Sequence, residues 1–188
     1  MKKLNYLFLI TAVAAILPGV RATTVIPPTF DELVDQAEII FQGDVTNVKS
    51  EWVGEGAQRH IMSYVTFRVE ELLKGKPGQS YTIRMLGGTV AGETMGVSDA
   101  PKFQVGDKDI LFVQNNGSQF IPLVGIMHGR FHVRTNDSGQ QVVTNNEDEP
   151  VKNVAHLGRM ASYASLDEPD LPAAAFKDAV KNKLQRRP

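Results

Sequence analysis

Two of the four histidines stand four positions apart, at His128 and His132, a spacing that could bring two imidazoles onto one metal ion. In zinc proteases this spacing occurs on a helix, but here no Glu follows the first His, and Gly129 and Val133 indicate a strand. Residues four apart on a strand are separated by about 13 Å, whereas zinc lies about 2 Å from a ligating nitrogen. We therefore predict no metal at this pair and expect two polar side chains on the surface.

The glycine-rich stretch from Gly87 to Gly96 could wrap a phosphate group. It lacks the Lys-Ser/Thr ending of a nucleotide-binding loop, and no helix is indicated after it, so an anion would find neither a cation nor a helix dipole there. A surface loop accounts for these glycines better.

The carboxylates give no clear catalytic pair. Residues 147–149 are three adjacent carboxylates that could bind calcium weakly, but they lack the spacing and the glycine of an EF-hand. Asp44, Glu70 and Glu71 lie on or near expected strands and are interpreted as solvated. The sequence holds no nucleophile-elbow serine motif and no cysteine. We therefore predict no catalytic residue, no metal site and no cofactor.

The first 22 residues are typical of an export signal. Lys2 and Lys3 form a basic start, residues 4–17 are almost wholly apolar, and small residues follow. Cleavage is expected before Thr23, which gives a periplasmic or secreted protein with no stable membrane insertion. The alternative is a retained membrane anchor, but a spanning helix needs about 20 apolar residues and this stretch is shorter.

Charge and cysteine content narrow the class of partner. Removing residues 1–22 takes away three of the 20 basic side chains and none of the 21 acidic ones, so the mature chain carries a net charge near −4. An acidic protein is poorly suited to nucleic acid, whose phosphates require a positive surface. Without cysteine there is no disulfide, so stability must come from the core.

Hydrophobic spacing predicts a chain made mainly of strands. A capping box from Thr29 to Glu32 predicts a short helix through Ala37. Alternation with a period of two then predicts strands at residues 39–48, 61–72, 81–85, 110–113, 120–126, 130–135 and 141–144. Between Gly87 and Gly106 the alternation is lost, so a long irregular loop is expected. So many strands with little helix favour a barrel, because closure removes exposed sheet edges.

The remainder of the chain differs in composition. Residues 146–172 contain prolines and acidic side chains and are expected to be a linker. Residues 173–188 are expected to form an amphipathic helix with Phe176, Val180 and Leu184 on one face. This helix is predicted to dock onto the barrel; the alternative is a basic helix on a membrane surface.

Two sequence patterns resemble a known family. These are A-x-I-I-F-x-G-x-V at residues 37–45 and V-x-F-x-V-x-x-L-L-K-G at residues 65–75. They resemble the opening strands of netrin-like modules and tissue inhibitors of metalloproteases, and they are similar to a group of exported bacterial proteins. The resemblance covers about residues 30–144. The resemblance implies an OB barrel. Together with the hydrophobic spacing, it leads us to expect a mainly β fold: a closed or partly open OB-like barrel of five to seven antiparallel strands in a domain spanning residues 23–145, with a short N-terminal helix and the separate C-terminal helix at residues 173–188.

The resemblance also implies candidate roles. Inhibitors of that family place a cysteine-led N-terminus on the protease zinc, whereas this mature chain should begin Thr-Thr-Val. We therefore expect a non-catalytic exported protein that binds another extracytoplasmic protein. The alternatives are a regulator or inhibitor of an exported protease, such as a metalloprotease, and a hydrolase with an unrecognised site. Contacts are expected at Thr23, Thr24, Gly87, Gly88, Thr89, Met95 and Asp99.

Overall fold

A computed structural model describes residues 26–159 and 168–186. The predicted export signal and the candidate residues Thr23 and Thr24 lie outside these ranges. The described elements, in chain order, are α2 (Phe30–Gln36), β1 (Ile39–Val53), the 3-10 turn η1 (Gly56–Gln58), β2 (His60–Lys74), β3 (Ser80–Leu86), β4 (Gly88–Val90), β5 (Glu93–Met95), β6 (Lys108–Val113), β7 (Arg130–Thr135), β8 (Gln141–Thr144), η2 (Val154–His156) and α3 (Ala173–Gln185).

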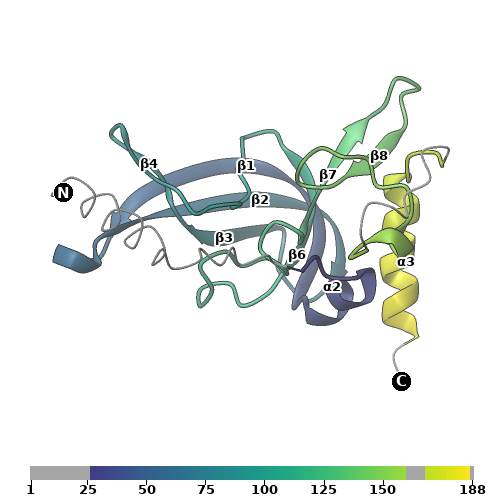
Figure 1. Ribbon diagram of the computed structural model, residues 1–188, viewed down its shortest axis with the longest axis horizontal. Helices are drawn as coiled ribbons and strands as arrows, with labels where there is room; N and C mark the ends of the chain where they lie inside the picture. The colour runs from purple at the N-terminus through teal and green to yellow at the C-terminus, as the bar shows by residue number, and fades with distance from the viewer. Residues whose placement is uncertain (1–25, 160–167, 187–188) are drawn as a thin grey trace, which may run out of the picture.

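The main sheet contains six antiparallel strands in the order β3-β2-β1-β6-β7-β8 (Figure 1). The mainly β fold is therefore confirmed. β3 and β8 form the two edges and do not pair with each other, so the expected closed barrel is not observed. β4 and β5 form a separate two-stranded sheet.

Both edges of the main sheet are occupied by other segments. On β3, the Asn116 side chain accepts a hydrogen bond from the Arg84 amide (3.0 Å) and donates one to the Thr82 carbonyl (2.9 Å). On β8, the Val143 amide donates to the Leu171 carbonyl (3.0 Å). Exposed strand edges are ready templates for pairing with other chains, so these contacts protect the sheet.

The sheet buries apolar side chains on both faces, because successive residues of a strand point to opposite sides. On β1, Ile40 belongs to a cluster beneath the two helices, whereas Phe41 belongs to a second cluster on the other face. Gln42, a polar residue of β1, is only 5% exposed. It is covered by α3, whose Lys177 Nζ donates to Gln42 Oε1 (2.8 Å).

The two helices form as their sequences predict. The capping box at the start of α2 is present, with the Thr29 amide 2.8 Å from Glu32 Oε2. Phe176 and Val180 of α3 are fully buried against the sheet, so the predicted docking is confirmed. Among the residues that the structure describes, no helix is long and apolar enough to cross a membrane.

The strand predicted at residues 120–126 is wrong. This segment makes turns, and only Leu123 forms an isolated bridge, to Val113. The chain must turn because Ile126 adopts a positive φ of 64°. It must also approach β6 closely, since a Cβ at Gly129 would lie 2.9 Å from the Phe112 carbonyl oxygen.

Two other segments contain more order than expected. The loop from Gly87 to Gly106 includes the β4–β5 hairpin, whose strands of three residues are too short to show alternation. Within residues 146–172, Val151 donates its amide to Val143 of β8 (3.0 Å), and Leu171 donates its amide to Val151 (2.8 Å). The described ends of this segment therefore lie against β8.

Candidate functional site

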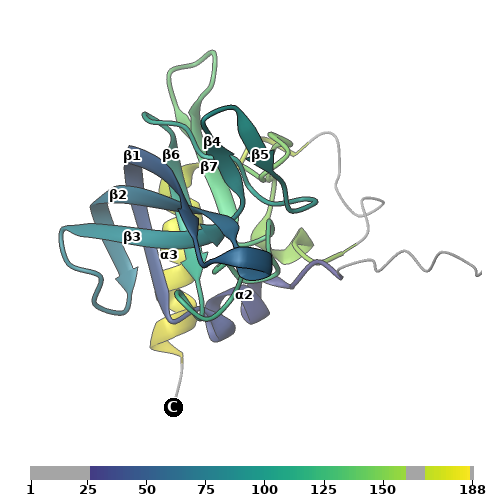
Figure 2. The ribbon, with the colours of Figure 1, turned by 90° about the vertical axis from the view of Figure 1, so that its left-hand side faces the viewer.

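A groove of about 440 Å³ lies between the β4–β5 hairpin and the main sheet. Figure 2 shows the two strands of this hairpin beside the strands of the main sheet. Its apolar lining includes Val48, Met95 and Val97, and its polar lining consists largely of hydroxyls and glycine backbone. Lys102 is the one ionisable residue in the lining given by the described part of the chain. We call this space the hairpin groove.

Two serine hydroxyls form hydrogen bonds at the residue that precedes β4. The Oγ atoms of Ser50 and Ser63 lie 2.8 Å apart, and Ser63 Oγ donates to the Gly87 carbonyl (2.6 Å). Gly88 follows with φ +135°, and a Cβ there would lie 2.5 Å from Ser50 Oγ and closer still to Ser63 Oγ. A side chain rarely adopts this backbone conformation, so the chain turns into the hairpin at a position that requires glycine.

Four of the predicted contact residues line this groove: Gly87, Gly88, Thr89 and Met95. They come together because Gly88 pairs with Met95 across the hairpin, and the Thr89 and Thr94 hydroxyls lie 2.9 Å apart. Asp99 does not line the groove, although it has an unusual positive φ of 61°.

The far wall of the groove is formed by residues 100–103, here called the strap. Phe103 packs edge-on against Phe67, with ring centroids 5.5 Å apart, and the Arg130 guanidinium lies 4.0 Å above the Phe103 ring. Arg130 Nη1 also donates to the Lys102 carbonyl (2.7 Å). The buried Arg130 side chain therefore holds the strap in place through contacts with Lys102 and Phe103.

Arg130 belongs to a buried charged cluster with Asp109 and His132. Arg130 Nε donates to Asp109 Oδ2 (3.0 Å), and His132 Nδ1 lies 2.8 Å from Asp109 Oδ1. Arg130 Nη2 lies 2.7 Å from Oδ2 of Asp107, which follows the strap in the chain. Asp109 is fully buried, and buried charges need such partners to offset the loss of water. The cluster thus links the sheet to the groove wall.

The surface position expected for His132 is wrong, because this side chain is only 5% exposed. Its location follows from strand pairing: His132 of β7 lies directly opposite Asp109 of β6. His128 lies in the turn before β7, so the strand spacing assumed for the two histidines does not apply. Burial lowers the pKa of the half-buried His128 below its usual value, although the charge of Glu147 opposes this shift.

His132 also lines a polar cavity of about 460 Å³ on the other side of the strap. With Nδ1 bonded to a carboxylate, Nε2 is the atom left to act as a base, and it lies 3.9 Å from Asp148 Oδ1. The described lining of this cavity contains no serine, threonine or cysteine that the imidazole could activate. In the described residues, no three His, Cys, Asp or Glu side chains are grouped to hold a metal.

Comparisons with known proteins add no family to this geometry. No protein-family model matches the sequence, and no curated protein matches it. The site is therefore interpreted from its own residues: a groove with a single charged side chain in its described lining and a wall fixed by a buried charged cluster.

Proposed function

We propose that this protein is a non-catalytic, exported binding module that holds an extended, uncharged segment of another extracytoplasmic protein in the hairpin groove. The observation that carries the proposal is the lining of the groove, which combines apolar side chains with hydroxyls and glycine backbone and only one charge. Such a surface offers hydrogen bonds to a peptide backbone and apolar contacts to its side chains, without favouring a charged ligand.

β-strand addition is the binding mode that suits this groove. In that mode an extended peptide pairs with a free strand edge, while alternate side chains enter pockets. Within the described residues, the outer edge of β5 makes no backbone hydrogen bond beyond its pairing with β4. The edges of the main sheet are already occupied. β5 is therefore the edge we propose for the bound segment, with Met95 and Val97 beside its apolar side chains.

A partly open OB-like barrel is our proposal for the fold that presents this groove. β1 pairs with β2 on one side and β6 on the other, and its pairing with β2 contains three register shifts. Such irregularities bend and twist a strand, which supports a strongly curved sheet. A Cβ at Gly43 would lie 2.5 Å from the Arg68 carbonyl oxygen, so the backbones of β1 and β2 approach closely at this glycine.

The test is selection from a displayed peptide library, followed by binding measurements with one selected peptide. We expect uncharged sequences with alternating apolar residues, and binding that is lost in Met95→Glu. Val105→Glu is the matched control, because Val105 is 66% exposed and does not line the groove. Equal binding by both variants would refute the proposal.

Assays on the same proteins address the alternative functions. Inhibition of a metalloprotease that is lost in Met95→Glu would make a protease the partner. Turnover of an ester or peptide substrate that is lost in His132→Gln would instead favour a hydrolase using the polar cavity.

A further inference from the structure

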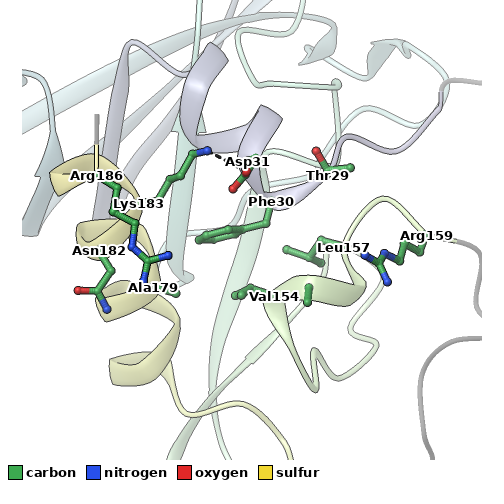
Figure 3. Close-up of a pocket in the computed structure, with 11 residues that line it drawn as sticks. Thr29, Phe30, Asp31, Val154, Leu157, Arg159, Ala179, Asn182, Lys183 and Arg186 are labelled. Carbon is green, nitrogen blue, oxygen red and sulfur yellow. Dashed lines mark ion pairs between the residues drawn. The ribbon is translucent and has the colours of Figure 1, made fainter. Parts of the chain in front are cut away.

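A second groove, of about 580 Å³, lies between the start of α2, the η2 turn and α3 (Figure 3). Figure 1 shows α3 at one end of the molecule, with the β4 strand of the hairpin toward the other. Apolar side chains form the floor of this groove: Phe30, Val154, Leu157 and Ala179. The groove therefore offers an apolar contact surface that is independent of the hairpin groove.

Three basic residues line this groove, and they differ in their partners. Lys183 Nζ lies 2.8 Å from Asp31 Oδ2 and 3.9 Å from Asp35 Oδ2, so its charge is already matched. The side chains of Arg159 and Arg186 are exposed, and neither guanidinium forms a hydrogen bond or ion pair with any described residue; only their backbone amides are bonded, to His156 and Asn182. They extend from different walls, Arg159 after η2 and Arg186 at the end of α3 (Figure 3). We call this space the basic groove.

These features define the chemistry of an occupant. A guanidinium binds a carboxylate through paired hydrogen bonds. Arg159 and Arg186 can therefore each bind one carboxylate of the occupant. In an extended peptide, neighbouring side chains point to opposite faces. An aliphatic side chain on the floor therefore leaves its two flanking side chains at the rim, where the arginines lie.

We infer that the basic groove binds a segment of a partner protein in which an aliphatic residue stands between two carboxylates. The positive rim is complementary to such a segment even though the chain as a whole has a net charge of −1. The predicted export signal, together with the residues up to position 25, contains no carboxylate. The N-terminal segment of this chain therefore lacks the charge that the groove would recognise.

The probe for this inference is a rhodamine-labelled peptide with the sequence Gly-Glu-Leu-Glu-Gly, followed by fluorescence anisotropy. We expect saturable binding that weakens about tenfold or more when both glutamates become glutamine, because a hydrogen bond to a charged group is stronger than one to a neutral group. Replacing the leucine with glycine should also weaken binding, since the floor would then be unoccupied.

Protein variants locate the site. The double variant Arg159→Gln and Arg186→Gln should lose the preference for the glutamate peptide, with an unchanged melting temperature because neither side chain has a partner in the described residues. Asn182→Glu adds a negative charge to the lining, which repels the negatively charged peptide. This variant should therefore bind the peptide more weakly although both arginines are present. Lys76→Gln removes an exposed cation elsewhere and should bind as the unmodified protein does.

Three results would overturn the inference. One is the absence of binding to the glutamate peptide, and another is equal binding by the double variant and Lys76→Gln. The third is binding of decanoate that depends on the two arginines while the peptide does not bind, because the groove would then take a small amphiphile.

Discussion

Lys108 and Asp109 are neighbours on β6, and their side chains belong to two different ionic networks. Lys108 is partly exposed and lies 2.8 Å from Asp44 Oδ1 and 2.6 Å from Glu70 Oε2. Asp109 is fully buried and binds Arg130 and His132. The bonds are similar in length, but exposed ion pairs contribute about 0–1 kcal/mol, whereas breaking a buried pair costs about 3–5 kcal/mol. Burial, more than bond geometry, sets their importance.

The largest expected effect follows from removing the buried charge. Asp109→Asn keeps the size of the side chain but leaves Arg130 without its buried counter-charge, so the free energy of unfolding should fall by about 3–5 kcal/mol. Asp44→Asn on the exposed network is the control and should cost about 1 kcal/mol or less. Denaturant unfolding measures both. Equal losses would mean that the two networks do not differ as we describe.

The same comparison applies to two adjacent residues of β2. Phe67 is fully buried, and Phe67→Ala should lower the free energy of unfolding by about 3–5 kcal/mol. The Arg68 side chain is 66% exposed and pairs with Asp44, so Arg68→Ala should cost well under about 1 kcal/mol. Denaturant melts test this pair, and comparable losses would show that the face assignment of β2 is wrong.

Gly88→Ala tests a close contact at the hairpin groove. The substitution adds a methyl group against the two serine hydroxyls at a positive φ, and we expect a loss of about 1–3 kcal/mol. Gly92→Ala shares the positive φ but meets nothing within 4 Å, so it should cost less. Thermal unfolding of both variants separates the cost of backbone strain from the cost of the close contact with Ser50 and Ser63. Equal losses of stability would show that the two serines do not contribute to the effect at Gly88.

The smallest expected effect concerns pH and the docking of α3. Hydrogen bonds from Lys177 and then Lys181 hold the pKa of Glu71 below its usual value of 4.5. Because the folded-state pKa is lowered, this contribution to stability is present above pH 4.5 and is lost as the pH falls through the folded pKa. The difference in unfolding free energy between the unmodified protein and Glu71→Gln should thus be present at neutral pH and absent in strong acid. A difference that persists in acid would contradict this.

Much of the fold could be predicted because its signals are local. The strands at residues 130–135 and 141–144 have the bounds that alternation and turn residues predict. Residues 120–126 were misassigned because an apolar run does not distinguish a strand from a buried turn. The buried cluster was missed for another reason: Asp109 meets Arg130 and His132 only through the register of β6 and β7, which no local pattern contains.

In the candidate site, too, some residues could be predicted from local sequence signals and others could not. Four predicted groove residues were found from the glycines, because a Gly-Gly pair marks a turn that a side chain would obstruct. The strap could not be foreseen, since its position depends on Arg130 reaching Lys102 from a distant strand. The two arginines of the basic groove also lacked a sequence signal, because the absence of a side-chain partner for them among residues 26–159 and 168–186 depends on what packs around them.

The central position of β1 has a consequence for the order of folding. β1 meets β2 through a short turn, with Val53 opposite His60, but it meets β6 only through distant pairs such as Ile39 with Val113. Local hairpins form in about 1–10 μs, whereas distant strand pairing is slowed by the entropy of closing a long loop. The β1–β2 hairpin should therefore form before β6 pairs with β1. Before β6 pairs with β1, the unpaired strand edge at residues 39–44, which begins with three apolar residues, is the part of the nascent sheet most open to association with another chain.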